Sequence, residues 1–399
     1  MNQKILETKI IPFISFMLGI SFCVSTALMS ASYIILAILI LFHTNFKMLI
    51  KQAFNNKFII MSVIFYLIFV IACIWSTGSV NDKWHMLTRI HGYMLAPLFF
   101  IVCQTNNSNK LILQGFLIGV VITAALSIIS YLCNYHVLYG IRDHTWVIFH
   151  GHILHNAFLA IAASFLLLLA FNKAKSKLQY VCYLIAYFLC FIDALFIVIG
   201  RTGQVMFLLL SIFAIIYQFR SKGILLTMGL ACICVPLLYF SPAIRYGFDN
   251  YQSDKARFEH GDVDTSMGLR WVFHKVSKEL YLQKPIIGYG TGSFKSVYEA
   301  YIIKHNIQGK PTANPHRDIL WIAVDTGIVG IIAFILMIIF AIVEICKLPF
   351  LYKGAGLSLI GGYILASIQN SFFIDNVTGI TFIILLLALI SSDSLNTPD

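Results

Sequence analysis

The sequence has few charged residues, and acidic residues are the scarcest of them. Of its 399 residues, 11% are charged, which is less than half of the roughly 25% found in soluble domains. In a water-soluble fold, so few charged residues could not cover a chain that is 59% hydrophobic and includes 33 Phe and 19 Tyr. This composition excludes a soluble enzyme, a soluble nucleic-acid-binding protein and a disulfide-stabilised scaffold. It predicts a polytopic membrane protein.

Cysteine is absent from the one long hydrophilic segment, at 241–315. All nine cysteines lie within or at the edges of apolar runs, which predicts packing in a core rather than disulfides or a zinc site. A cleavage site of small residues is also missing after the first apolar run. That run is therefore predicted to be retained as a membrane span.

The apolar runs predict an all-α fold with about twelve transmembrane helices, since about 20 residues cross a bilayer. The predicted spans are 10–27, 30–46, 58–77, 88–103, 111–133, 151–171, 179–200, 203–219, 223–240, 316–343, 356–374 and 377–391.

Lysine and arginine are unevenly distributed over the short connections between these spans. Thirteen lie in the N-terminal tail and the even-numbered connections, and four lie in the odd-numbered ones. The positive-inside rule then predicts that both termini are cytoplasmic.

One connection, at 241–315, is a hydrophilic segment of 75 residues on the outer side. Loops of this length are commonly functional. The segment Met267–Leu282 has the apolar spacing of an amphipathic helix that ends before Pro285. Residues 241–317 carry eleven basic and seven acidic side chains, and this excess on the outer side predicts an anionic ligand. The predicted organisation is thus spans one to nine in 1–240, a loop cap in 241–315, and spans ten to twelve with a cytoplasmic tail in 316–399.

His316 is the first candidate for chemistry. Asn314 is a good N-cap and Pro315 suits a first helical position, so His316 is predicted in the first turn of span ten. The positive end of a helix would keep this imidazole neutral and would attract anions. The alternative interpretation is an interfacial histidine that hydrogen-bonds to the loop.

Two arginines on the outer side are candidates for anion binding. Arg201 follows a strongly apolar helix, where no positive-inside preference explains it. The alternative is a snorkelling anchor, or a partner for Asp193. Arg270 opens the amphipathic loop helix, and a guanidinium binds phosphate through a planar fork. The Gly-x-Gly-x-Gly element at 288–292 is predicted to be a tight turn that lets the backbone approach a neighbour, rather than a nucleotide loop.

Other polar residues near the spans have less specific patterns. The five histidines between positions 136 and 155 match no standard zinc spacing, so packing and hydrogen bonding are the favoured interpretation and no metal site is predicted. Asp193, Asp325 and Asp375 are either proton-relay groups or partners of buried polar neighbours.

Taken together, these motifs resemble the O-antigen ligase superfamily, which includes O-antigen ligases, O-antigen polymerases and protein O-oligosaccharyltransferases. The family pattern is His, then Asn, Ser or Gln, nine residues, Gly, two residues, and Gly, Thr or Tyr. Here His316, Gly327 and Gly330 keep that spacing, while Arg317 replaces the small polar residue. The string around Arg201 resembles the family's membrane-edge arginine motif. Arg270 and 285–294 resemble its loop arginine followed by P-x-x-G-x-G-x-x-x-F.

The resemblance implies a bacterial inner-membrane glycosyltransferase that needs no cofactor, with its site facing the periplasm. The implied donor is a glycan on undecaprenyl diphosphate, and the implied acceptor is a sugar hydroxyl of lipid A–core. His316 would act as general base, Arg201 and Arg270 would bind the diphosphate, and Arg317 and Arg142 are secondary candidates. A metal-independent, inverting transfer is expected.

Two alternatives remain open at this stage. A polymerase of the same superfamily would use the same donor but another lipid-linked repeat as acceptor. A secondary transporter also fits twelve spans in this length, although the sequence shows no repeat of motifs between its halves.

Overall fold

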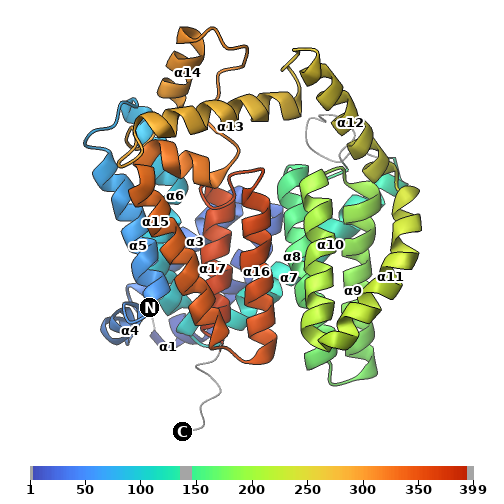
Figure 1. The fold of residues 1–399 in the computed structure, drawn as a ribbon. Helices are drawn as coiled ribbons and strands as arrows, with labels where there is room; N and C mark the ends of the chain where they lie inside the picture. Colours follow the sequence, from blue (N-terminus) through green and yellow to red (C-terminus); the bar gives the residue numbers. More distant parts are fainter. Residues whose placement is uncertain (1–2, 135–145, 393–399) are drawn as a thin grey trace.

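The chain folds into an upright bundle of helices that is covered at one end by three further helices (Figure 1). The computed structural model describes residues 3–134 and 146–392, and all regular structure in these residues is helical. The first part of the bundle comprises α1 (Gln3–Ile5), the π-helical turn η1 (Leu6–Ile10), α2 (Ile11–Val24), α3 (Thr26–Ile40), α4 (Phe46–Ala53), α5 (Lys57–Ala72), α6 (Val80–Gln104) and α7 (Ser108–Leu132). The second part comprises α8 (His152–Lys173), α9 (Lys177–Ile192), the π-helical turn η2 (Asp193–Ile197), α10 (Arg201–Phe219), α11 (Ser221–Tyr239), α15 (Asp318–Cys346), α16 (Phe350–Ser367) and α17 (Asn376–Ile390). The three covering helices are α12 (Pro242–Glu259), α13 (Ser266–Gln283) and α14 (Phe294–Lys304).

Each predicted span overlaps one of the upright helices, which confirms the all-α membrane fold. Seven helices of the described chain are long and apolar enough to cross a membrane, and α4 with α5 forms an eighth candidate that is bent by 82°. Shorter apolar helices include α3, α17 and the first part of α11. The exact number of twelve crossings stays a prediction.

Several helix starts differ from the predicted boundaries because serine side chains cap them. The α3 helix begins earlier than predicted, where Ser25 Oγ accepts a hydrogen bond from the Leu28 amide at 3.2 Å. The α6 helix begins eight residues before the predicted span, where Ser79 Oγ accepts from the Asp82 amide at 3.1 Å. Capping satisfies amides that a helix leaves free, so polar residues outside the apolar run extend these helices.

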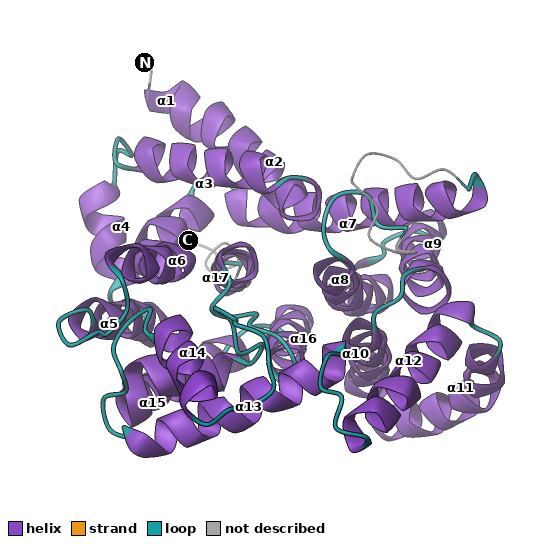
Figure 2. Cartoon of the chain, turned by 90° about the horizontal axis from the view of Figure 1, so that it is seen from above, coloured by secondary structure: helices purple, strands orange, loops and turns teal. Residues whose placement is uncertain are grey.

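The α8 helix occupies the interior of the bundle, with α7, α9, α10 and α16 packed against it. Most of its apolar span is buried inside the protein. Viewed from above, α8, α10 and α16 lie next to one another beneath the end of α13 (Figure 2). The upper ends of these helices therefore meet the covering helices.

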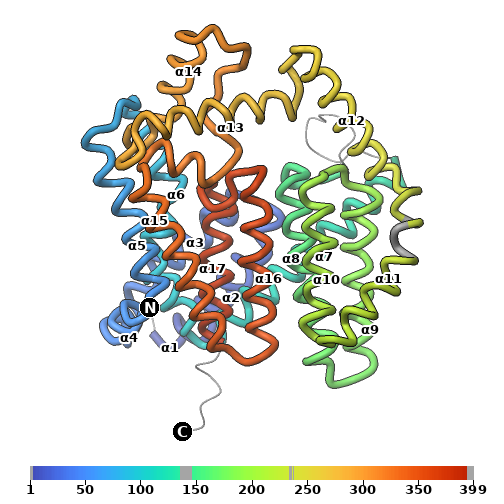
Figure 3. The backbone as a smooth tube through the Cα atoms, viewed as in Figure 1, coloured from blue at the N-terminus to red at the C-terminus, as the bar shows by residue number. Residues whose placement is uncertain are grey.

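Residues 241–315 contain the three covering helices. The chain rises through α11, passes into α12, and returns over the bundle as α13 (Figure 3). The amphipathic helix predicted at Met267–Leu282 is confirmed as α13, whose buried residues include Val272, Phe273, Val276 and Leu280. Its apolar face packs against α15 and α14, so α13 is held firmly over the bundle.

Candidate active site

Arg201 and Arg270 lie in one pocket of about 290 Å³ between the bundle and its cover. Arg201 is the first residue of α10, and Arg270 lies in the first part of α13. The rest of the lining comes from α10, α12, the start of α13, and α16: Thr202, Val205, Met206, Tyr251, Met267, Leu365, Ile368 and Gln369. The fold thus brings together two arginines that are 69 positions apart in the sequence.

Close packing between α8 and α10 fixes the position of Arg201. A Cβ atom on Gly203 would lie 2.2 Å from Cβ of Asn156, so only glycine allows these helices to approach so closely. The guanidinium carbon of Arg201 lies 5.9 Å from the ring centre of Tyr251 on α12, within the range of a cation–π contact. Its Nη1 is buried and has no hydrogen-bond partner in the described part of the chain.

The positive charges of the pocket are not neutralised by any carboxylate in the part of the chain that the structure describes. Neither Arg201 nor Arg270 forms an ion pair with a carboxylate among the residues that the structure describes. Burial, and then the charge of Arg201, lower the pKa of the Arg270 guanidinium. An anion in this pocket would satisfy the free Nη1 donor of Arg201 and relieve the repulsion between the two charges.

His316 lies before the helix that was predicted to contain it. The α15 helix begins at Asp318, with Arg317 at the N-cap position, and His316 has a left-handed backbone with φ of 55°. The prediction that Asn314 caps the helix is wrong, because Asn314 Oδ1 accepts hydrogen bonds from the His316 amide and from Ser371 Oγ, both at 2.7 Å. Asn314 therefore forms a turn that fixes the backbone of His316.

The His316 ring is close enough to the arginine pocket to be affected by the positive charge of Arg270. It stacks on Phe273 of α13, with ring centres 6.1 Å apart and planes inclined by 19°. Burial lowers the pKa of His316 to about 4, with further contributions from the charge of Arg270 and from His274. The predicted neutral imidazole is thus supported, but burial and Arg270 replace the end of the helix as its cause.

His274 is a site residue that the sequence analysis missed. It follows Arg270 by four residues on α13, the spacing of one helix face, and this spacing is the signal that could have found it. Burial lowers its pKa, as do the charges of Arg317 and Arg270, and its Nε2 has no hydrogen-bond partner in the described chain. Arg317 is therefore close to the site, whereas the other secondary candidate, Arg142, lies outside the described residues.

The loop 285–293 docks into a break in α15. Gly327, inside this helix, has a φ of 64°, and a Cβ atom there would lie 2.3 Å from the carbonyl oxygen of Ile286. The break lets the Ile328 amide donate to the carbonyl of Pro285 at 2.8 Å. Asp325 Oδ2 accepts from the Gly292 amide at 2.9 Å. The motif that begins at His316 and includes Gly327 therefore contacts the P-x-x-G-x-G-x-x-x-F motif at 285–294.

The glycines of this loop have the role predicted for them. Gly288, Gly290 and Gly292 all have positive φ. A Cβ atom on Gly290 would lie 2.2 Å from Cα of Ser76, in the connection between α5 and α6. The element is a tight turn that allows close backbone approach, and it links α15 to that connection.

Asp193 has partners other than Arg201. His155 Nε2 lies 2.7 Å from Asp193 Oδ2, and Ser127 Oγ donates to Asp193 Oδ1 at 2.6 Å. The alternative pairing of Arg201 with Asp193 is therefore wrong. Asp193 and Asp325 both satisfy buried polar groups, as the second interpretation of these residues expected.

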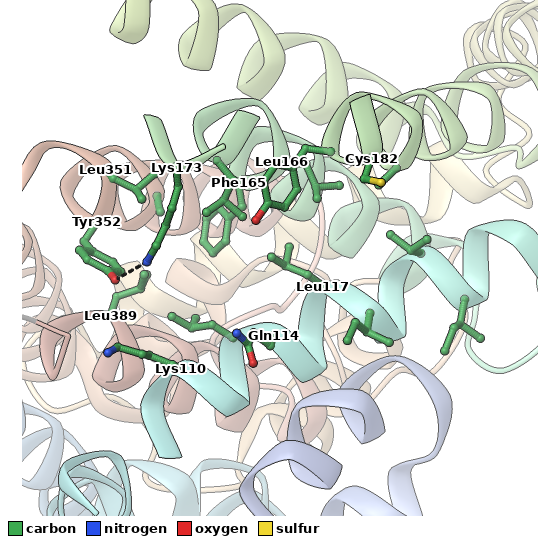
Figure 4. A pocket seen from close by; sticks show the side chains of 18 residues that line it. Lys110, Gln114, Leu117, Phe165, Leu166, Lys173, Cys182, Leu351, Tyr352 and Leu389 are labelled. Carbon is green, nitrogen blue, oxygen red and sulfur yellow. Dashed lines mark hydrogen bonds between the residues drawn. The ribbon is translucent and has the colours of Figure 1, made fainter. Parts of the chain in front are cut away.

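An apolar groove of about 540 Å³ lies between α7, α8, α9, α16 and α17. Lys110, Lys173 and Tyr352 gather in one part of it, where Lys173 Nζ lies 3.3 Å from the Tyr352 hydroxyl (Figure 4). Lys173 ends α8 and is 21 residues, or about 30 Å of helix, from His152 at its start. Arg270 lies close enough to His152 for their charges to interact. The arginine pocket is therefore near the start of α8, whereas Lys173 of this groove is at the other end of the same helix.

Comparison with known protein families matches residues 185–335 to the family described as O-antigen ligase. The comparison with curated proteins found no match. The matched range contains Arg201, Arg270 and His316, together with the break in α15 and the loop that docks there. In this part of its length, the chain is similar to the O-antigen ligase family.

Proposed function

We propose that this protein transfers a glycan from undecaprenyl diphosphate to a sugar hydroxyl of lipid A–core. The observation that carries the proposal is the pocket shared by Arg201 and Arg270, which have no carboxylate partner among the described residues, with Arg270 close enough to lower the pKa of His316. Two unneutralised guanidiniums suit a diphosphate, and an unprotonated imidazole can accept a proton.

In the proposed step, His316 accepts the proton of the acceptor hydroxyl, and the hydroxyl oxygen bonds to the anomeric carbon of the donor. The bond from that carbon to the diphosphate oxygen breaks, and its electron pair leaves with undecaprenyl diphosphate. Arg201 and Arg270 stabilise the charge that develops on this leaving group. A single displacement inverts the anomeric configuration, and the proposal requires no metal ion or cofactor.

In this proposal, donor binding also raises the pKa of His316. In the free protein, burial and Arg270 hold the pKa of His316 at about 4, which makes it a weak base. A bound diphosphate offsets the charge of Arg270 and raises the affinity of the ring for a proton. The donor therefore improves the base that its own reaction requires.

The proposed setting is the bacterial inner membrane, with the site facing the periplasm and both termini in the cytoplasm. The asymmetric distribution of lysine and arginine supports this orientation. The arginine pocket lies with α12 and α13 at the end of the bundle away from Lys173. Lys173 is one of the lysines predicted to face the cytoplasm, so this arrangement supports the proposed orientation.

The test is a transfer assay on purified protein with undecaprenyl-diphosphate glycan and lipid A–core, with and without EDTA, read by mass. Glycan-extended lipid A–core that persists in EDTA is expected, and His316→Ala should abolish it while an exposed control, His305→Ala, retains it. Product that is lost in EDTA would contradict the metal-independent mechanism. Elongated lipid-linked repeats would instead identify a polymerase, and movement of the glycolipid without any covalent product would identify a transporter.

A further inference from the structure

A second pocket, of about 250 Å³, lies between α6, α14 and the start of α15. It shares no lining residue with the arginine pocket. Its volume is below the range of about 300–1,000 Å³ that is typical of sites for drug-sized ligands, so it suits a single small unit. The polar side chains around it are Asp82, His85, Arg89, Lys295 and Trp321.

Trp321 leaves a hydrogen-bond donor unused in this pocket. The side chain is 4% exposed, and its Nε1 has no hydrogen-bond partner in the described chain. Buried indole N–H groups usually have a partner, and an unmade bond of this kind is costly. A ligand oxygen in the pocket would accept this bond.

The charges around Trp321 define the ligand further. The guanidinium of Arg89 lies over the Trp321 ring, 5.2 Å from its centre. Neither Arg89 nor Lys295 forms an ion pair among the described residues. Asp82 supplies an acceptor, although it already accepts from Ser79 Oγ at 2.6 Å. Two free cations, an indole donor and one carboxylate match a hydroxylated unit that carries a negative charge.

The pocket is lined by residues that are close to His316 in the sequence. Its lining residues Ala313 and Trp321 lie three residues before and five residues after His316, and the Trp321 amide donates to the carbonyl of Arg317 at 3.1 Å. Arg270, in the other pocket, is close enough to lower the pKa of the His316 ring. His316 is thus within a few residues of this pocket and close to Arg270 of the other.

We infer that the pocket of Arg89, Lys295 and Trp321 binds an anionic sugar unit of the acceptor, one that bears a phosphate. This inference rests on the proposed function, because it assigns the acceptor to this pocket and the donor diphosphate to the arginine pocket. The pocket would hold that unit while a neighbouring hydroxyl of the same acceptor reaches His316.

The test measures binding of phosphorylated core oligosaccharide, and of the same oligosaccharide after phosphatase treatment, to the purified full-length protein. Phosphatase treatment, Arg89→Gln and Lys295→Gln should each weaken binding about tenfold, as expected for a lost charged hydrogen bond. Trp321→Phe keeps the ring but removes the N–H donor, and should weaken binding of both forms. Trp271→Phe on α13 is the matched control and should bind as the wild type does.

Kinetics separates this inference from the proposed function. The three pocket variants should raise the KM for the acceptor and leave the KM for the donor unchanged. Lys295 is exposed, so its variant reports on binding even if Trp321→Phe fails to fold. Equal acceptor binding by the wild type and Lys295→Gln, with no preference for phosphate, would overturn the inference while transfer itself persisted. Binding that depends on Lys295, in a protein that transfers no glycan, would uphold the pocket and reject the proposed function.

Discussion

The carboxylate of Asp325 accepts a hydrogen bond from the backbone amide of Gly292 at 2.9 Å, across 33 positions of sequence. Its second oxygen accepts from the Phe294 amide at 3.1 Å. Asp325 is fully buried inside α15, so this one side chain fixes the loop that follows α13 to a membrane helix. The loop and the helix in turn determine where Arg270 and His316 lie relative to each other.

Replacing Asp325 by Asn should destabilise the protein by about 1–3 kcal/mol, the cost of leaving a buried donor unsatisfied. The two loop amides donate to different oxygens of Asp325, and in Asn one of these oxygens is replaced by an NH₂ group that cannot accept a hydrogen bond. Thermal unfolding of purified protein measures the effect. Asp375→Asn is the control, because Asp375 caps α17 and Asn caps helices equally well. Equal stability of the two variants would show that the Asp325 contacts contribute little.

Gly327→Ala should also destabilise the protein, by about 1–3 kcal/mol, since the residue has a φ of 64° and its new methyl group would meet the Ile286 carbonyl. The matched control is Gly361→Ala in α16, where no atom lies within 4 Å of the added Cβ. The control should be neutral or more stable, because alanine favours a helix. Unfolding temperatures of both variants test the comparison, and an unaffected Gly327→Ala variant would show that the break tolerates a side chain.

Arg270→Lys should lower kcat/KM for the donor by about 10- to 100-fold, although the charge is kept. An ammonium group cannot make the two parallel hydrogen bonds that a guanidinium makes to phosphate. Arg257→Lys on α12 is the control, since Arg257 is exposed and paired with Asp262. Donor titrations of both variants give the comparison. Full activity of Arg270→Lys would mean that Arg270 contributes only its charge.

Arg201→Met should lower transfer by about 100-fold or more, the range measured when a transition-state donor is removed. The same variant should leave the unfolding temperature unchanged or higher, because it removes one of two like charges that have no carboxylate partner in the described chain. Arg245→Met on α12, an exposed arginine that contacts Tyr239, controls for the substitution. Loss of both activity and stability at Arg201 would indicate a structural role.

The pH dependence of transfer should differ between the free and the donor-bound protein. In the proposed mechanism the neutral form of His316 is the active one, so activity should fall as pH drops through its pKa. For kcat/KM this acid limb should lie near pH 4, because the free protein holds the pKa of His316 at about 4. For kcat it should lie at higher pH, since bound diphosphate offsets Arg270. Unfolding temperatures at each pH control for denaturation, and coincident limbs near pH 6.5 would contradict both assignments.

Much of the fold follows from the sequence because membrane spans are local features. Within a membrane, the backbone N–H and C=O groups of an apolar run must hydrogen-bond to one another, and only a helix achieves this within one segment. This is why each predicted span overlaps a helix. Helix starts were less accurate, because the capping residues Ser25 and Ser79 lie before the apolar runs that predict the helices they cap. The amphipathic helix α13 was also predictable, since its apolar spacing is local.

The sequence by itself determined the membrane class, the helices, and the arginines and histidine that the family motifs mark. Only the tertiary structure decided that Arg201 and Arg270 share a pocket, that Asp193 pairs with His155, and that His316 precedes α15 in a turn made by Asn314. These arrangements depend on contacts between distant segments, such as Ser371 with Asn314 and Gly292 with Asp325. Local pattern fixes which residues can form a helix, whereas burial and the partners available in three dimensions fix the protonation and geometry of the site.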